Sequence, residues 1–184
     1  MRPVLVSLLC HPERDPKVVL PDGEGYQVFV NKTPNYAEAH RVAIARAVAG
    51  GMDLVTADTD GYHPEAEILK LTAGSYHGDE PALVLPFRTN LGIQSKAFSL
   101  FYSVVKRKRV RDATSGLCRL SYGLMVALPP LKSVDMTVHI EILNFALKAR
   151  ARIVQYGYAS SANDASGSKR TANYQWKLLK ATFG

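Results

Sequence analysis

The chain has 184 residues, of which 47% are hydrophobic, which is typical of one globular domain spanning residues 1–184. No apolar run approaches the roughly 20 residues that a membrane-spanning helix needs, and the first apolar stretch is too short and too soon charged for a signal peptide. We therefore expect a cytoplasmic protein. Cys10 and Cys118 lie far apart without metal-site spacing, so free thiols are expected.

The formal net charge of +7 predicts an anionic partner. Nucleic acid, phosphorylated metabolites and an anionic membrane surface all satisfy this requirement. The densest basic stretch, 106–111, closes an amphipathic segment at 93–107, and cations are favoured at the C-terminus of a helix. We interpret the stretch as a helix end and nucleic acid as the less favoured partner.

Apolar segments of strand length alternate along the chain with segments of helical periodicity. This alternation predicts an α/β fold with a mainly parallel sheet and helices on both faces. In such sheets the ligand crevice lies beyond the carboxyl ends of the strands. Strands are expected at 3–9, 26–30, 53–57, 82–87 and 152–158, and helices at 36–51, 63–71, 93–107, 121–128, 138–151 and 173–183.

Two aspartates, Asp58 and Asp60, follow the expected strand at 53–57 directly. Carboxylates one residue apart at a strand end can hold Mg²⁺ or Mn²⁺ while leaving coordination positions for phosphate oxygens and water. The spacing also fits a simple turn in which the aspartate oxygens cap the following helix. Both interpretations are open at this point.

The order of several motifs in the chain helps to choose between these two interpretations of the aspartates. The segments are "TADTDGYHPEAEILKL" at 56–71, "RVRDATSGLCRLSYGLMVAL" at 109–128, "HIEILNFALKARARIVQYGY" at 139–158 and "ASGSKR" at 165–170. In this order they resemble the family 2 glycosyltransferases, with the nearest likeness to the dolichol-phosphate, or polyprenyl-phosphate, mannose synthase type. The resemblance covers about residues 31–169 and implies a Rossmann-like nucleotide-diphospho-sugar transferase (GT-A) fold.

The resemblance implies a site residue by residue. It makes Asp58 and Asp60 the ligands of Mg²⁺ or Mn²⁺ and of the nucleoside diphosphate, and it makes His63 a structural residue at the start of the next helix. Arg88 matches a basic residue after the family's next strand. Lys96 falls in the connecting helix, and both cations suit phosphate groups.

Further positions follow from the later motifs. Asp112, Ser115 and Gly116 match the family's Asp-X-X-Ser-Gly loop, in which glycine permits close backbone approach. Asp112 is expected to be catalytic and Ser115 to bind the ligand. Glu141 falls at the family's helix glutamate and is the second expected catalytic carboxylate.

The closing loop and the positions before it show departures from the family. Ser168 and Lys169 match the Gly-X-Ser-Lys loop that closes over the diphosphate. That loop normally begins with an arginine and has a glycine three residues later, whereas this chain has Asn163 and Ser166. The family glutamine that follows the second aspartate is replaced by Tyr62.

The N-terminal part is the largest departure. Family members open with a strand, a helix and a second strand carrying an acidic residue, and residues 2–32 are too few for all three. Asp15, Asp22 and Glu24 are the acidic candidates, and no alignment chooses among them.

The resemblance implies an inverting, metal-dependent transfer of a hexosyl group, mannosyl or glucosyl, from a nucleoside-diphosphate sugar to a polyprenyl phosphate. A phosphate acceptor is already anionic, so it needs no dedicated base. A hydroxyl acceptor would need one, with Asp112, Asp135 or Glu141 as candidates. Two alternatives stay open: a degenerate member that binds a nucleotide or a protein partner, and a basic nucleic-acid-binding domain. Peripheral membrane contact and a homo-oligomer are also left open.

Overall fold

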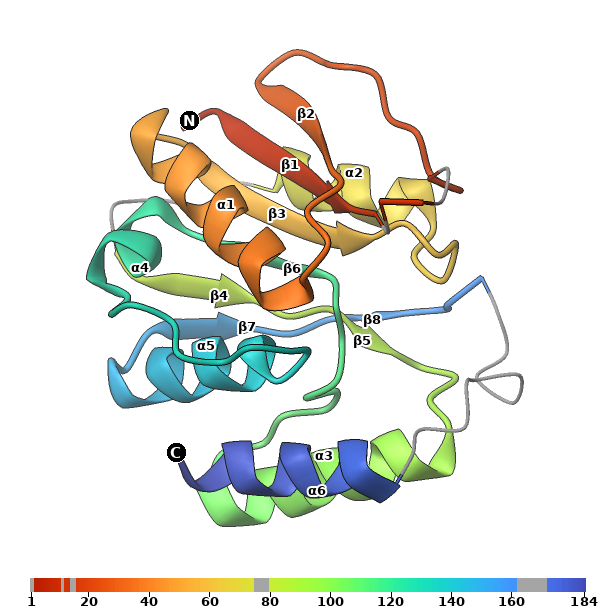
Figure 1. The fold of residues 1–184 in the computed structure, drawn as a ribbon, viewed down its shortest axis with the longest axis vertical. Helices are drawn as coiled ribbons and strands as arrows, with labels where there is room; N and C mark the ends of the chain where they lie inside the picture. Colours follow the sequence, from red (N-terminus) through yellow and green to blue (C-terminus); the bar gives the residue numbers. More distant parts are fainter. Residues whose placement is uncertain (1, 11, 14–15, 75–79, 162–171) are drawn as a thin grey trace.

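The computed structural model describes residues 2–10, 12–13, 16–74, 80–161 and 172–184 (Figure 1). Within them a six-stranded sheet has the order β2-β1-β3-β6-β4-β7, and β6 alone runs antiparallel to its neighbours. The predicted α/β fold with a mainly parallel sheet is confirmed. The strands are β1 (Val4–Leu9), β2 (Tyr26–Asn31), β3 (Asp53–Asp58), β4 (Ala82–Val84), β5 (Phe87–Arg88), β6 (Cys118–Leu120), β7 (Arg152–Val154) and β8 (Gly157–Tyr158).

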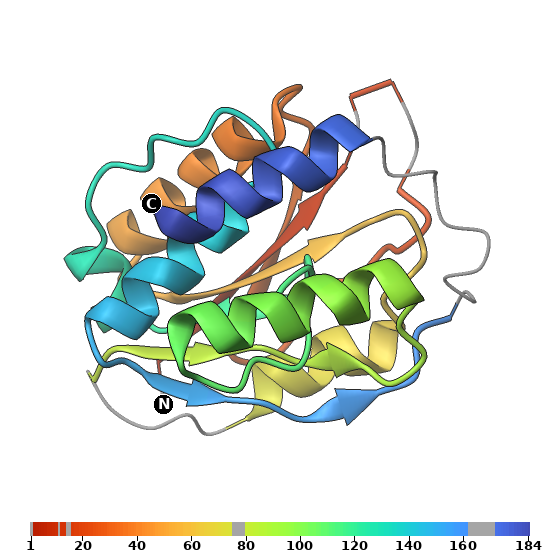
Figure 2. The ribbon, with the colours of Figure 1, turned by 90° about the horizontal axis from the view of Figure 1, so that it is seen from below.

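Helices cover both faces of the sheet, as predicted (Figures 1 and 2). One core cluster joins the sheet to α1, α3, α4, α5 and α6, and a second joins the opposite face to α2. In the described residues no helix is long and apolar enough to cross a membrane. The helices are α1 (Tyr36–Ala49), α2 (Glu65–Ala73), α3 (Ile93–Lys106), α4 (Tyr122–Ala127), α5 (Val138–Lys148) and α6 (Ala172–Phe183).

The alternation of side chains along the strands explains the two cores. All six residues of β1 are buried, as expected for a strand covered on both faces. Leu5 belongs to the first cluster, whereas Val4, Val6 and Leu8 belong to the second. Because neither face of β1 meets solvent, the strand has no polar face, and its apolar residues form a nearly continuous run in the sequence.

Two expected strands are divided and one strand was missed. The segment 82–87 splits into β4 and β5 around Pro86, which lacks the N–H that a ladder requires. The segment 152–158 is divided in the same way into β7 and β8. β7 pairs with β4 in the main sheet, and β8 pairs with β5 in a separate two-stranded sheet. The three residues of β6 are too few to show periodicity, yet they lie in the middle of the main sheet.

The N-terminal part is shortened as expected. β1 and β2 pair in parallel, and the described residues between them contain no helix. The register places Leu9 opposite both Asn31 of β2 and Asp58 of β3. The carboxyl ends of three adjacent strands thus meet at one level, which is where the candidate site lies.

Candidate functional site

A cleft of about 290 Å³ lies beyond the carboxyl ends of β1, β2 and β3. Both predicted metal-binding aspartates face it, so the structure brings them together at the edge where parallel strands bind ligands. The other walls come from the segment before β2, the start of α1 and the loop before α5. Its lining includes Lys17, Thr33, Tyr36, Asp58, Asp60 and Met136.

Asp58 is the last residue of β3, and its side chain is 24% exposed. Tyr36 Oη donates a 3.1 Å hydrogen bond to Oδ1, and His63 Nε2 lies 4.0 Å from Oδ2. Burial, followed by the negative charge of Asp60, raises the pKa of the Asp58 carboxyl to about 7. The folded protein therefore holds Asp58 in an environment that disfavours its negative charge.

Asp60 lies on the turn between β3 and α2. The backbone N–H of Tyr62 donates to its Oδ1 at 3.1 Å. Partial burial raises the pKa of Asp60, against the opposing effects of this hydrogen bond and of the positive charges of Lys17 and Arg88. No side chain caps α2, so the alternative in which the aspartates serve as helix caps is wrong for this helix.

Gly116 lies directly against Asp58. A Cβ atom at this position would overlap the Asp58 carboxylate, so only glycine allows the loop and the carboxylate to approach this closely. The reason is the antiparallel pairing of β6 with β3, which sets Cys118 opposite Thr56 just beyond the loop. The close backbone approach predicted for Gly116 thus has a definite partner, the carboxylate of Asp58.

His63 is a buried residue next to Asp58. Its ring is 3% exposed, and Nδ1 lies 2.8 Å from the Tyr158 hydroxyl. Burial, followed by the positive charge of Arg88, lowers the pKa of His63 to about 4. The ring is therefore neutral at physiological pH, which agrees with the structural role predicted for it.

Arg88 and Asp112 meet each other. Arg88 Nε and Nη2 donate to the two carboxylate oxygens of Asp112 at 2.8 and 3.3 Å, and Nη2 also donates to Thr114 Oγ1 at 2.9 Å. Their side chains are 8% and 0% exposed. The two charged groups bond to each other and neither residue lines the cleft of Asp58 and Asp60, although the positive charge of Arg88 acts on both aspartates. Ser115 is also buried, and its hydroxyl donates to the Leu117 carbonyl at 3.3 Å.

Two further predicted positions, Glu141 and Lys96, do not line the cleft. Glu141 accepts 2.8 Å hydrogen bonds from the backbone N–H groups of Lys132 and Ser133, one on each oxygen. Burial alone would raise the pKa of Glu141, but these hydrogen bonds outweigh it and the pKa is lowered. Lys96 is exposed on α3. Ser168 and Lys169 lie outside the described residues, as do the neighbouring departures from the family loop.

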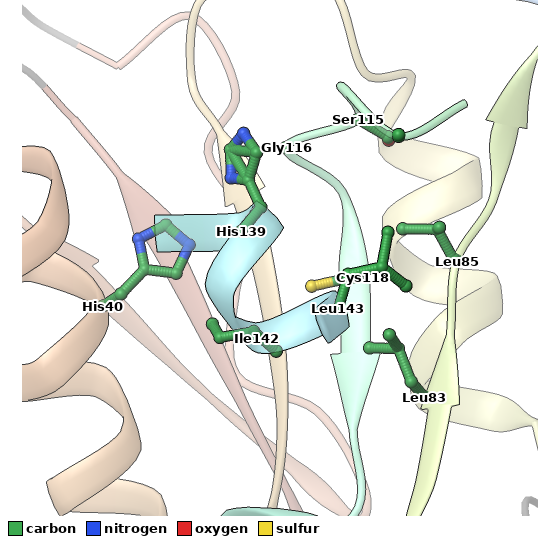
Figure 3. Close-up of a pocket in the computed structure, with 10 residues that line it drawn as sticks. His40, Leu83, Leu85, Ser115, Gly116, Cys118, His139, Ile142 and Leu143 are labelled. Carbon is green, nitrogen blue, oxygen red and sulfur yellow. The ribbon is translucent and has the colours of Figure 1, made fainter. Parts of the chain in front are cut away.

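One histidine of α5 lies near the Ser115–Gly116 loop. His139, in the first turn of α5, packs edge-on against Tyr36 with ring centroids 5.6 Å apart, and it lies 6.1 Å from the His40 ring. Figure 3 shows both histidines at one small cavity of about 20 Å³, large enough for one water molecule. Burial lowers the pKa of His40 to about 4. The cavity is also lined by Ser115, Gly116 and Cys118.

The sequence analysis did not assign three residues of this region to the site. Tyr36 was assigned only to a helix, although its hydroxyl reaches Asp58. Lys17 lines the cleft from a loop without any motif. His139 lies two residues before Glu141, and only the direction of the first helical turn shows that His139 is the residue facing the Ser115–Gly116 loop. The sequence alone gave no signal for choosing between His139 and Glu141, which are two residues apart on the same helix.

Two of the acidic candidates near the N-terminus, Asp22 and Glu24, do not line the described cleft. Asp22 and Glu24 precede β2, at the edge of the sheet opposite to Asp58, and Asp22 Oδ1 accepts from the Val28 N–H. Asp15 lies outside the described residues. The residue that ends β2 beside the cleft is Asn31, whose buried amide donates to the Ala39 carbonyl at 2.8 Å.

Together the sheet order, the strand-end aspartates and the close glycine define the GT-A fold of nucleotide-sugar glycosyltransferases. No family model and no curated protein matches the chain. Among solved structures the chain is similar to glucosyl-3-phosphoglycerate synthase from Mycobacterium tuberculosis. With Mn²⁺, UDP and phosphoglyceric acid bound, that structure gives a TM-score of 0.69 at 17% identity over 98% of this chain and 77% of that chain.

The same enzyme with UDP gives a TM-score of 0.65 at 17% identity over 99% of this chain and 79% of that chain. With Mg²⁺ and UDP the TM-score is 0.61 at 17% identity, over 98% of this chain and 78% of that one. At this identity the likeness establishes the fold. The finer resemblance to the polyprenyl-phosphate mannose synthase type stays a prediction.

Proposed function

We propose that this protein is a metal-dependent glycosyltransferase that transfers a hexosyl group from a nucleoside-diphosphate sugar with inversion. The observation that carries the proposal is the convergence of Asp58 and Asp60 on a cleft at the carboxyl ends of three strands, with Gly116 packed against Asp58. The similar fold of an enzyme captured with UDP and either Mn²⁺ or Mg²⁺ supports it.

The two aspartates fit Mg²⁺ or Mn²⁺. Among the described residues no group of three or more histidines, cysteines and acidic residues could hold a metal ion, so the chain offers two carboxylates and leaves the remaining positions to diphosphate and water. The raised pKa of Asp58 arises partly from Asp60, a repulsion that a cation relieves. When bound, the ion would neutralise charge on the leaving diphosphate.

Other groups in the cleft suit the rest of the donor. Lys17 can contact the diphosphate, since its positive charge already acts on Asp60. Thr33 and Met136 line the part of the cleft left for the nucleoside. The predicted contacts from Arg88, Lys96, Ser115, Ser168 and Lys169 are part of this proposal and await testing.

For the acceptor we propose a polyprenyl phosphate, which needs no base because it is already an anion. A small phosphorylated acceptor that reacts through a hydroxyl is the second candidate, favoured by the phosphoglyceric acid bound to the similar enzyme. The two acceptors differ in what they demand of the protein, since only the hydroxyl requires a base.

Calorimetry with UDP-glucose and GDP-mannose, with and without Mn²⁺, tests the donor site. We expect metal-dependent binding of one donor, about tenfold weaker near pH 6 than at the plateau above pH 7, because a proton on Asp58 with its pKa of about 7 competes with the metal. The donor's diphosphate diester does not titrate in this range. Binding without sugar transfer to any acceptor would identify the degenerate alternative, and no binding of either donor would contradict the proposal.

A matched pair of variants tests whether His139 or Glu141 acts as the base when phosphoglyceric acid is the acceptor. If His139 accepts the hydroxyl proton, His139→Ala lowers kcat by about 100-fold with little change in KM. Glu141→Gln should change kcat far less, because both carboxylate oxygens are bound to backbone N–H groups. The opposite order, measured by steady-state kinetics, would restore the catalytic role predicted for Glu141.

A further inference from the structure

One face of α3 exposes large apolar side chains. Ile93, Leu100 and Val104 are 85%, 68% and 69% exposed. Their spacings of seven and four residues place them along one side of the helix, while Phe98 and Tyr102 on the other side are buried in the core. Isolated exposed apolar residues are ordinary on protein surfaces, but a continuous stripe along a helix indicates a binding surface.

The neighbouring helix α6 extends this surface. Figures 1 and 2 show α3 and α6 side by side below the sheet, and the Phe101 and Phe183 rings meet edge to face at 6.1 Å. On α6, Trp176 is 58% exposed and Phe183 is 71% exposed. Lys180 Nζ lies 5.4 Å above the Trp176 ring. We call these exposed residues of α3 and α6 the two-helix face.

The charged side chains carried by the two helices are all positive, and one acid from outside them, Asp135, pairs with Lys177 of α6 at 2.8 Å. Neither the 93–106 segment nor the 172–183 segment contains an aspartate or glutamate. Lys96 and Lys180 are exposed beside the apolar residues, and α3 ends in the basic stretch 106–109. A surface that combines exposed aliphatic side chains, a tryptophan and an excess of cations matches the chemistry of an anionic lipid surface.

We propose that the two-helix face binds the surface of a membrane that contains anionic lipids. The aliphatic and aromatic side chains enter the headgroup region, Trp176 takes the interfacial position that its ring favours, and the cations contact lipid phosphates. The basic end of α3 thereby has a function beyond helix termination. A second copy of this chain suits the face less well, because two such faces would bring mainly positive charges together.

Membrane binding by this face does not depend on sugar transfer. The donor cleft lies at the carboxyl ends of β1 and β3, away from the two-helix face below the sheet (Figure 1). Binding to vesicles and binding to nucleotide sugars can therefore be measured separately, and either can fail without the other.

Vesicle co-sedimentation tests the proposal with phosphatidylcholine alone and with phosphatidylcholine mixed with phosphatidylglycerol. The native chain should bind the mixed vesicles in a salt-sensitive manner and bind pure phosphatidylcholine much less. The double variant Leu100→Glu, Val104→Glu should lose more than about tenfold in partitioning, because it removes apolar contacts and adds two negative charges. The matched control Val19→Glu, Val126→Glu changes residues that are 66% and 57% exposed elsewhere, and should bind as the native chain does.

Thermal unfolding of both variants establishes that each is folded, since all four positions are exposed. Equal binding by the two double variants would overturn the proposal, as would a native chain that ignores phosphatidylglycerol. Sedimentation velocity provides the remaining arm. A native dimer that the Leu100→Glu, Val104→Glu variant dissociates, without vesicle binding by the native chain, would assign the face to a second copy instead.

Discussion

An Asp58→Asn variant should be more stable than the native chain near pH 8 in the absence of metal, and should lose metal-dependent donor binding. The pKa of Asp58 is raised from 3.8 to about 7, so the folded state favours the protonated form. This stabilisation is complete below the unfolded pKa and is lost as the pH rises through the folded pKa. The loss is roughly 4 kcal/mol, since the pKa shift spans about three units and one unit corresponds to about 1.4 kcal/mol. Asparagine is neutral throughout and can still accept the Tyr36 hydrogen bond.

Urea unfolding of the native chain and the variant between about pH 4 and pH 8 measures this effect. The difference in the free energy of unfolding should grow in favour of Asp58→Asn up to about pH 7 and then level off. Mn²⁺ together with the donor should stabilise the native chain but not the Asp58→Asn variant. The control Glu24→Gln replaces an exposed carboxylate and should show no such trend. A difference that does not vary with pH would show that the site does not disfavour the charge of Asp58.

The parts of the fold that sequence reasoning obtained are those with strong local signals. The six predicted helices were found because apolar periodicity and end residues agree, as in α1, where Asn35 accepts from the Glu38 N–H and Gly50 ends the helix. Asp58 and Asp60 were placed correctly because a buried strand must end where its apolar run ends. These signals act over a few residues, so the sequence displays them directly.

The parts that were missed depend on contacts between distant segments. Arg88 and Asp112 pair across 24 positions, and nothing in either local sequence distinguishes a buried ion pair from two residues that face a ligand. That His139 and not Glu141 lines the cavity beside Ser115 depends on the direction of one helical turn. β6 is short and antiparallel, and it is fixed by its neighbours on both sides. In each case tertiary packing decides what local pattern leaves open.

The position of β6 depends on a buried ion pair, and breaking that pair should produce the largest loss of stability. Arg119 is 2% exposed, and its Nη2 lies 2.7 Å from Asp53 Oδ2 at the start of β3. Arg119 Nη1 also donates to the carbonyls of Leu71 and Gly74 at the end of α2, at 2.6 and 2.8 Å. Arg119→Met should lower the free energy of unfolding by about 3 to 5 kcal/mol, because it leaves a buried carboxylate without its cation.

Urea unfolding measures this loss, with Arg109→Met as the control at an exposed arginine that should change stability by less than about 0.5 kcal/mol. Adding Asp53→Asn to Arg119→Met should recover part of the loss, since no unpaired charge then remains buried. A loss below about 1 kcal/mol for Arg119→Met would contradict the assignment. Because the same pair fixes β6 against β3, it also fixes Gly116 against Asp58. The variant should therefore weaken metal-dependent donor binding even where it is fully folded, which connects the stability of the sheet to the geometry of the cleft.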